Sequence, residues 1–442
     1  MEPICAISTA YGTGGIAVIR VSGEKSISIV DTLFVGRSPL GETPANSVRY
    51  GQIVREGEVL DDVLCSVFHA PHSFTGEETV EIACHGSLYI QQTLLQWLID
   101  AGARMAQPGE FTRRAFLNGK MDLSQAEAVA DLIAAQSRAE KDLALSQLRG
   151  SVSNELAGLR DRLLHFTSLI ELELDFADHE ELEFADRTEL TALATEIETK
   201  LAALMASFRT GNAIRNGIPV AIVGAPNVGK STLLNALLGE QRAIVSDIQG
   251  TTRDTIEDTL VIDGILFRLI DTAGMRDTDD TLENMGIERS RKAIERAQIV
   301  VHVADNVQCT KDDVRWMYEG TKGTIINVLN KIDLQPRAKS QELIAISAKN
   351  GEIEPLKQEL VRIARASMQT SAVMLSNARH YEAVSRAHDA IIRVQQGLKD
   401  GLSGELLSMD LQDCLNALGE VTGQITNAEV LANIFSKFCI GK

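Results

Sequence analysis

Residues 220–231, Val-Ala-Ile-Val-Gly-Ala-Pro-Asn-Val-Gly-Lys-Ser, join a short apolar run to a glycine-rich loop that ends in Lys-Ser. The spacing from Gly224 to Lys230 and Ser231 is that of a P-loop, and the apolar run before it predicts a strand. Glycines let the backbone N–H groups close around phosphates, and the N-terminus of the following helix adds a favourable dipole. The stretch therefore predicts a strand, a phosphate-binding loop and a helix in succession.

Six residues of this stretch are candidate nucleotide ligands: Asn227, Val228, Gly229, Lys230, Ser231 and Thr232. We expect the catalytic Lys230 ammonium to reach the β- and γ-phosphates, and the Ser231 hydroxyl to ligate Mg²⁺. A chance glycine-rich turn is the alternative, but the strand and helix predicted on either side count against it.

Two later motifs, each at the end of a predicted strand, indicate that the base is guanine. They supply the candidate ligands Asn330, Lys331, Asp333, Ser347, Ala348 and Lys349. The Asp333 carboxylate can accept two hydrogen bonds from guanine N1–H and the exocyclic amine, which adenine does not offer. The stem of Lys331 can cover the base, and the loop 347–349 can place backbone N–H groups near the guanine carbonyl.

The γ-phosphate side is predicted from two segments between these motifs. After a predicted strand at 266–270, the candidate ligands are Asp271, Thr272, Ala273 and Gly274. Asp271 suits the Mg²⁺ shell, and the Gly274 N–H can contact the γ-phosphate. In the segment 250–254, Gly-Thr-Thr-Arg-Asp, Thr252 is our candidate for a switch-loop Mg²⁺ ligand, with an ordinary polar turn as the alternative. The P-loop and the motifs at 271–274, 330–333 and 347–349 follow one another along the chain in the order that a GTPase requires, each at the end of a predicted strand.

The residue after Gly274 is Met275, where Ras-like proteins carry a glutamine that orients the attacking water. Methionine cannot orient water by strong hydrogen bonds. Another polar group must do so, and Glu283 is the candidate with Glu288 as its rival. Charge compensation must also come from elsewhere: an arginine, a cation or a partner subunit.

The region with the nucleotide motifs and the segments on either side of it have different sequence patterns. Predicted strands at 220–223, 266–270, 299–303, 324–329 and 343–346 alternate with helical stretches. This alternation predicts a mainly parallel sheet with helices on both faces, a Ras-like P-loop domain over residues 213–370. The segments 121–212 and 371–442 have helical sequence patterns. They predict one discontinuous helical domain, into which the P-loop domain is inserted.

Residues 1–120 have an α+β pattern, with strands predicted at 16–21, 63–68 and 79–84 and a helix at 88–99. Two capping boxes are expected to open helices, Ser124-Gln-Ala-Glu127 and Thr426-Asn-Ala-Glu429.

The composition is that of a folded, multidomain protein. The 442 residues suggest roughly three domains. A formal charge of −18, from 43 basic and 61 acidic residues, argues against non-specific coating of nucleic acid. No apolar run is long enough for a membrane span, and the scattered cysteines suit a reducing compartment. We expect a cytoplasmic protein.

The chain closely resembles the MnmE (TrmE) family of tRNA modification GTPases over nearly its whole length. The resemblance rests on the motifs above, on Pro108-Gly-Glu-Phe-Thr-Arg-Arg-Ala-Phe-Leu-Asn-Gly-Lys120 and on the terminal Phe438-Cys-Ile-Gly-Lys442. It implies that, with the FAD-dependent partner MnmG (GidA), the protein adds an aminomethyl or carboxymethylaminomethyl group to carbon 5 of the wobble uridine of certain tRNAs.

The resemblance also implies cofactors and a quaternary structure. The one-carbon unit comes from a 5,10-methylene- or 5-formyl-tetrahydrofolate, and the N-terminal domain is folate-binding-like and forms a constitutive homodimer. The family's folate contacts carry over to Arg20, Glu81, Lys120 and Lys442. A carboxylate can pair with the edge of a pterin, and the cations can meet carboxylates; a surface ion pair is the alternative for each.

The family uses K⁺ for charge compensation, and hydrolysis drives a conformational change. The K⁺ ligands carry over to Asn227, Ser246, Ile248 and Thr251, and the water-orienting glutamate to Glu283. Cys439 carries over as a candidate catalytic thiolate, and a small buried thiol is its alternative.

Two other functions remain open. A non-modifying GTPase switch, such as a ribosome-assembly factor, would need neither the folate residues nor Cys439. A stand-alone folate-dependent methyltransferase would need no FAD partner.

Overall fold

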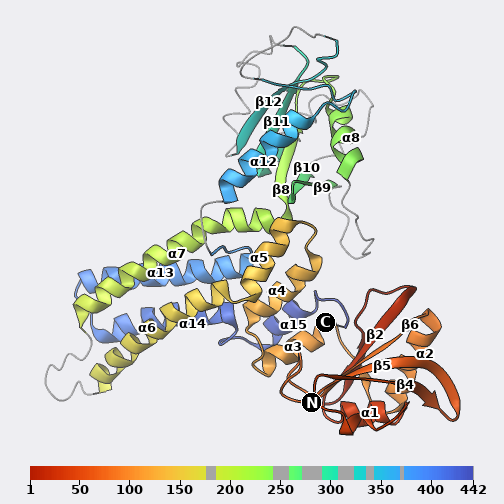
Figure 1. The fold of residues 1–442 in the computed structure, drawn as a ribbon. Helices are drawn as coiled ribbons and strands as arrows, with labels where there is room; N and C mark the ends of the chain where they lie inside the picture. Colours follow the sequence, from red (N-terminus) through yellow and green to blue (C-terminus); the bar gives the residue numbers. More distant parts are fainter. Residues whose placement is uncertain are drawn as a thin grey trace. The chain divides into compact units, whose positions relative to one another are not determined.

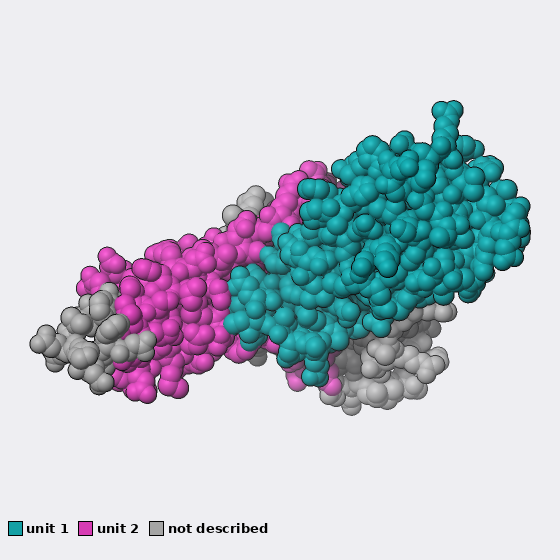
Figure 2. Space-filling model, turned by 90° about the horizontal axis from the view of Figure 1, so that it is seen from below, with its two compact units in different colours: residues 1–130, 419–442 teal, residues 131–418 magenta. Residues whose placement is uncertain are grey.

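The computed structural model describes residues 1–175, 186–241, 258–270, 291–306, 323–334, 343–368 and 373–441, and Figure 1 shows its elements. The chain divides into two compact units (Figure 2), one of residues 1–130 with 419–442 and one of residues 131–418. Each unit has a hydrophobic core of its own.

The N-terminal unit is built on a seven-stranded sheet in the order β3-β4-β5-β6-β2-β1-β7 (Figure 1). Neighbouring strands are antiparallel except β1 and β7, which are parallel. The strands are β1 (Ile4–Ile7), β2 (Gly14–Ser22), β3 (Phe34–Gly36), β4 (Ser47–Arg55), β5 (Glu58–Phe68), β6 (Thr79–Gly86) and β7 (Arg104–Met105). The three strands predicted from the sequence are confirmed as parts of β2, β5 and β6.

One face of this sheet carries the core. In β6 the side chains of Val80, Ile82 and Cys84 are buried, as the period of two requires. The same cluster includes residues of the helices α1 (Ser26–Asp31) and α2 (Leu88–Asp100) and of the short 3₁₀ helix η1 (Leu40–Glu42). The helix predicted at 88–99 is confirmed as α2.

Three helices complete this unit: α3 (Glu110–Leu117), the start of α4 (Leu123–Ala134) and α15 (Ala428–Phe435). Leu123 and Ala126 of α4 form a buried cluster with Phe435 and Phe438. The last residues of the chain therefore pack into the same unit as the first.

Both predicted helix caps are wrong by one or two residues. At α4 the Asp122 carboxylate accepts from the Gln125 N–H, and the Gln125 amide oxygen accepts from the Asp122 N–H, both at 2.9 Å. This is a capping box two residues before the predicted one, and the buried Leu123 is already the first residue of the helix. At α15 the cap is Asn427, which accepts from the Val430 N–H, rather than Thr426.

A buried ion network ties α3 to the start of the chain. Arg114, which is 2% exposed, donates to Glu110 and to Glu77, both at 3.0 Å. Arg104 donates to the same Glu110 carboxylate at 2.7 Å. Burial alone would raise the pKa of Glu110, but the hydrogen bonds from Arg104, the Gln107 amide and Arg114 outweigh it and lower the pKa to about 2. The network therefore keeps Glu110 ionised.

Replacing Arg114 by Met should destabilise this unit by about 3–5 kcal/mol, because it leaves buried carboxylates without their cation. The matched control is Arg55→Met in the same unit, whose pair with Asp100 has side chains 34% and 37% accessible and should contribute less than about 1 kcal/mol. Urea unfolding followed by Trp97 fluorescence, in a Trp316→Phe background, reports on the N-terminal unit. Equal losses in the two variants would contradict the assignment of a buried network.

The second unit contains long helices and an α/β region. The helices are α5 (Arg138–Leu148), α6 (Ser151–Asp175), α7 (Arg187–Asn216), α13 (Ala378–Lys399) and α14 (Gly404–Thr422). Helices α7 and α13 lie side by side (Figure 1) and are far apart in sequence. Phe208 stacks on Tyr381 with ring centroids 4.5 Å apart, and the Ser207 hydroxyl accepts from the Leu375 N–H at 3.0 Å.

The α/β region lies between α7 and α13 in sequence and has a six-stranded sheet in the order β13-β12-β11-β8-β10-β9. All neighbouring strands are parallel except β9 and β10. The strands are β8 (Ile218–Val223), β9 (Asp258–Ile262), β10 (Ile265–Ile270), β11 (Ile299–Ala304), β12 (Thr324–Leu329) and β13 (Ile344–Ala345). All five predicted strands of this region are confirmed.

Both faces of this sheet carry buried apolar clusters, so its central strands are mostly apolar. Val220 and Ile222 of β8 pack with α8 (Lys230–Gln241) and α12 (Glu354–Met368) on one face. Ala221 and Val223 belong to a cluster on the other face. The mainly parallel sheet predicted from the sequence is confirmed.

Candidate nucleotide-binding site

The loop between β8 and α8 has two glycines with positive φ, +154° at Gly224 and +100° at Gly229. A Cβ at Gly224 would lie 2.2 Å from the carbonyl oxygen of Val303, and one at Gly229 would lie 2.3 Å from Nδ2 of Asn330. Only glycine fits such close approaches. The loop is therefore held against its neighbours by its backbone, and its N–H groups are free of covering side chains at these two positions.

Lys230, the first residue of α8, closes the loop. Its ammonium donates to the carbonyl oxygens of Gly224 and Ala225 at 2.9 and 2.7 Å. Burial lowers its pKa from the ordinary lysine value. The ammonium is thus held against the loop by two backbone carbonyls, and its role toward phosphates stays a prediction.

Asn330 joins the P-loop to the loop after β13. Its side chain is 4% exposed, donates from Nδ2 to the Val228 carbonyl at 2.9 Å, and accepts from the Ala348 N–H at 3.0 Å. One buried amide therefore holds together three loops, of which the P-loop is more than 100 residues away in sequence from the other two. A guanine carbonyl would compete with Asn330 for the Ala348 N–H.

Lys331 has a left-handed backbone, with φ of 61°. Its ammonium donates to the Asn227 carbonyl at 2.7 Å and pairs with the Asp305 carboxylate at 2.8 Å. Asn227 also has a left-handed φ, 63°. Two non-glycine residues in this sparsely populated region meet at the site, which is typical of functional loops.

Asp333 accepts a hydrogen bond at 2.7 Å from the hydroxyl of Ser347, which is fully buried. The Ser347 N–H donates instead to the Glu352 carbonyl at 3.2 Å. The sequence motif suggested a backbone role for Ser347, and its hydroxyl contact with Asp333 was missed. Only the tertiary structure could reveal it, because the two residues lie on different loops.

The γ-phosphate side of the site lies outside the described residues. The sequence predictions that fall there are Ser246, Ile248, Thr251, Thr252, Asp271, Thr272, Ala273, Gly274 and Glu283. Ser231 and Thr232 are described as exposed residues of the first turn of α8. The exposed Lys349 follows Ala348. The base and P-loop side of the site is thus the part whose geometry is known.

The N-terminal unit brings together most of the residues that the resemblance assigns to folate. Arg20 of β2 faces Glu81 of β6 in register, and its Nε donates to the carboxylate at 2.9 Å. The guanidinium lies 5.5 Å from the ring centroids of Phe74 and Phe111. Phe74, 36% exposed, was not singled out from the sequence.

Lys120 contacts the segment that carries Phe74. Its ammonium donates to the Pro71 carbonyl at 3.0 Å. The fourth folate candidate, Lys442, lies outside the described residues.

The segment with Cys439 packs against the start of the chain. The Cys439 carbonyl accepts from the Gly109 N–H at 3.3 Å, and the Gly441 carbonyl accepts from the Ser8 hydroxyl at 3.3 Å. The backbone is therefore anchored to the N-terminal unit, while the Cys439 side chain is exposed. The alternative of a buried structural thiol is wrong.

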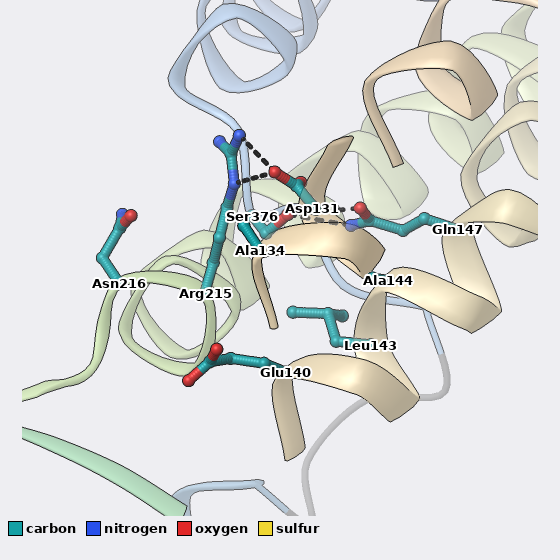
Figure 3. Close-up of a pocket in the computed structure, with 9 residues that line it drawn as sticks. All are labelled: Asp131, Ala134, Glu140, Leu143, Ala144, Gln147, Arg215, Asn216 and Ser376. Atoms are coloured by element: carbon teal, nitrogen blue, oxygen red, sulfur yellow. Dashed lines mark hydrogen bonds and ion pairs between the residues drawn. The ribbon is translucent and has the colours of Figure 1, made fainter. Parts of the chain in front are cut away.

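A separate cavity of about 180 Å³ lies among α4, α5, α7 and the residues before α13 (Figure 3). On its wall the Arg215 guanidinium donates to the Asp131 carboxylate, with Nε and Nη2 lying 3.0 and 2.7 Å from Oδ1. The Gln147 amide donates to the Ser376 hydroxyl at 3.0 Å. These polar side chains hydrogen-bond to one another, which indicates that they hold the surrounding helices together.

Other classes of site are not seen in the described part of the chain. Among its helices none combines the length and apolar character that a membrane crossing requires. Within the same residues, His, Cys, Asp and Glu side chains nowhere gather in a group of three that could hold a metal ion.

Comparison with family models gives two matches that together span most of the chain. A model described as the MnmE helical domain matches residues 123–439, and a model described as the GTP-binding protein TrmE N-terminus matches residues 3–120.

Curated relatives match over the whole chain. A tRNA modification GTPase MnmE of Parabacteroides distasonis is 54% identical, covering 100% of both chains. One of Porphyromonas gingivalis is 50% identical, covering 100% of this chain and 98% of the relative.

Among solved structures, the G domain of the T. maritima FeoB iron transporter is 25% identical. The match covers 33% of this chain and 98% of that chain, with a TM-score of 0.26.

Proposed function

The chain belongs to the MnmE family of tRNA modification GTPases, and from this premise we propose that it hydrolyses GTP as part of tRNA modification. The observation that carries the proposal is the joining of three loops by Asn330. The P-loop, the loop 330–333 and the loop 347–349 meet with Lys230, Lys331 and Asp333 arranged around them. This combination suits a guanine nucleotide.

The finer reaction follows from the resemblance. With MnmG, an FAD-dependent partner, the protein would add an aminomethyl or carboxymethylaminomethyl group to carbon 5 of the wobble uridine. A tetrahydrofolate derivative would supply the one-carbon unit, and GTP hydrolysis would drive a conformational change. We expect this chemistry to take place in the cytoplasm, because the scattered cysteines suit a reducing compartment.

Hydrolysis would proceed by in-line attack of water on the γ-phosphate. The loop N–H groups and the Lys230 ammonium stabilise the charge that develops on the phosphate oxygens. Ser231, at the start of α8, and Thr252 would hold Mg²⁺, which neutralises phosphate charge when bound. Glu283 would orient the water.

Potassium would be held by Asn227 with Ser246, Ile248 and Thr251, of which Asn227 is described. Asn227 is exposed, and its carbonyl is engaged by the Lys331 ammonium, so its side-chain oxygen is the group available to a cation. An amide oxygen is a suitable ligand for a hard cation. K⁺ here would supply the charge that other GTPases take from an arginine.

Replacing K⁺ by Na⁺ at constant ionic strength should lower the turnover number for GTP about tenfold or more, because a charge that stabilises the transition state is lost. The affinity for GDP should change less than about twofold, since a transition-state interaction does not affect ground-state binding. Asn227→Ala should remove the difference between the two salts. Equal turnover of the wild-type chain in both salts would contradict the potassium assignment.

Folate binding would use Arg20, Glu81, Lys120 and Lys442, to which we add Phe74. The Arg20–Glu81 pair is partly exposed, with side chains 17% and 30% accessible, so its charged edge can meet a ligand. The exposed ring of Phe74 beside it offers a face on which a flat heterocycle can stack. We propose that residues 1–120 form a folate-binding-like domain on this basis.

We also propose that the N-terminal domain forms a homodimer. Tyr50, Leu64, Ala83 and Val18 lie opposite one another across β4, β5, β6 and β2, on the sheet face away from the core. Tyr50 and Leu64 are 67% and 48% exposed. An apolar row across four strands, uncovered in the single chain, suits a second copy of the same sheet.

The remaining domains would be 121–212 and 371–442 as one helical domain, with residues 213–370 inserted into it as the G domain. The packing of α7 on α13 supports this arrangement, since these helices flank the α/β region in sequence. The exposed Cys439 thiol would assist in activating the uridine, and its anchored backbone would fix its position.

The proposed function is tested by mass spectrometry of tRNA nucleosides from cells that lack this protein. Wobble uridines modified at carbon 5 should disappear and return with the wild-type chain, but not with Glu81→Gln. Asp263→Asn, at an exposed turn that is part of neither candidate site, is the matched control and should restore them. If the modified nucleosides persist without the protein while ribosomal subunit profiles change, the chain is a GTPase switch instead.

A further inference from the structure

Asp305, the residue after β11, is not part of any nucleotide motif predicted from the sequence, yet it contacts the guanine-recognition loop. We propose that Asp305 is a positioning residue, whose carboxylate holds the Lys331 side chain in place for covering the guanine base. The proposal rests on the assignment of residues 330–333 to guanine recognition made above.

Two anchors fix the end of the Lys331 side chain. The ammonium lies 2.8 Å from the Asp305 carboxylate and 2.7 Å from the Asn227 carbonyl oxygen. Asp305 belongs to the sheet side of the site, and Asn227 to the P-loop. The aliphatic stem of Lys331 therefore extends from its own loop to a point between Asp305 and the P-loop.

The backbone conformation alone does not determine the direction of the Lys331 side chain. A lysine side chain has many rotamers of similar energy, and holding it in one of them costs conformational entropy. An ion pair and a carbonyl contact that exist before the nucleotide arrives remove part of that cost from binding. The left-handed φ of Lys331 and the buried Asn330 next to it fix the other end of the stem.

The contribution of Asp305 to nucleotide affinity depends on how exposed its ion pair with Lys331 is. Lys331 and Asp305 are 36% and 40% accessible, so water and salt screen the pair. Asp305→Asn keeps the size of the side chain and removes its charge. We expect it to raise the dissociation constants for GDP and GTP about threefold to fivefold, the upper range for exposed pairs. The turnover number at saturating GTP should remain within about twofold of wild type, because the phosphates are held by other residues.

The experiment measures GDP affinity and GTP kinetics of the full-length chain with Asp305→Asn and with the control Asp263→Asn. Asp263 is also an acid with a basic partner, Arg365, and its φ of 50° is one that asparagine tolerates. The control should bind GDP as the wild type does. Asp305→Glu, which restores the charge on a longer stem, should recover part of the affinity.

A double-mutant cycle separates positioning from general stability. In a Lys331→Met background, Asp305→Asn should change GDP affinity by less than about 1.5-fold, because its partner is gone. An unchanged affinity of Asp305→Asn in the wild-type background, or the same loss in the Lys331→Met background, would overturn the proposal. Asp305→Ser, which also removes the charge, gives the same comparison if the asparagine variant is poorly folded.

Failure of the proposed function would be seen differently. In that case the wild-type chain itself would not bind GDP, whatever stands at position 305.

Discussion

Asp333→Asn is expected to change the preferred base from guanine to xanthine. The Asp333 carboxylate accepts from guanine N1–H and from the 2-amino group in our proposal. With asparagine, one acceptor becomes an N–H₂ donor that faces the 2-amino donor, so GDP loses one hydrogen bond and gains a repulsion. Xanthine carries a carbonyl at that position and restores the pair. The ratio of GDP to XDP affinity should change by about 10²–10⁴.

The structure indicates which way the new amide faces. The buried Ser347 hydroxyl donates to Oδ1 of Asp333 at 2.7 Å, and in the variant it favours the rotamer that keeps an oxygen there. The amide nitrogen then takes the place of Oδ2. Direct titration with fluorescent GDP and XDP measures the two affinities, and Asp263→Asn serves as the control. A variant that still prefers GDP would show that Asp333 does not recognise the base.

Lys230→Met should reduce GTP hydrolysis about 10²–10³-fold, because it removes a cation from the charge that develops on the phosphate oxygens. Methionine is close to lysine in length and keeps its apolar contacts. Lys230 is half-buried over the P-loop and donates to two of its carbonyls, so the loop also loses two internal hydrogen bonds.

Single-turnover hydrolysis, measured at saturating enzyme, isolates the chemical step from nucleotide affinity. Lys399→Met is the control, since Lys399 is an exposed lysine in the last turn of α13, is not part of the predicted site, and should affect the rate less than about threefold. A Lys230→Met rate within about fivefold of wild type would mean that the ammonium does not act on the transferred phosphate.

The strands of the α/β region and the P-loop could be predicted because their signals are local. A continuous apolar run such as 220–223 is typical of a strand in a parallel sheet that is covered on both faces. Gly224, Gly229 and Lys230 lie within seven residues, and their spacing follows from wrapping a backbone around phosphate. The exact helix starts could not be predicted in the same way. Asp122 and Asn427 carry the caps, rather than Ser124 and Thr426, and each true cap lies within two residues of another residue type that can also cap a helix.

What the sequence by itself determined is therefore the order of elements, the motif identities and the apolar faces, each of which depends on neighbours along the chain. The tertiary structure alone decided which loops meet. It brought Asp305 to Lys331, Ser347 to Asp333, and Asn330 between Val228 and Ala348. Strand register likewise placed Arg20 opposite Glu81, 61 residues away. Such contacts depend on how sheet edges and loops pack in space, and no periodicity in one sequence encodes that packing.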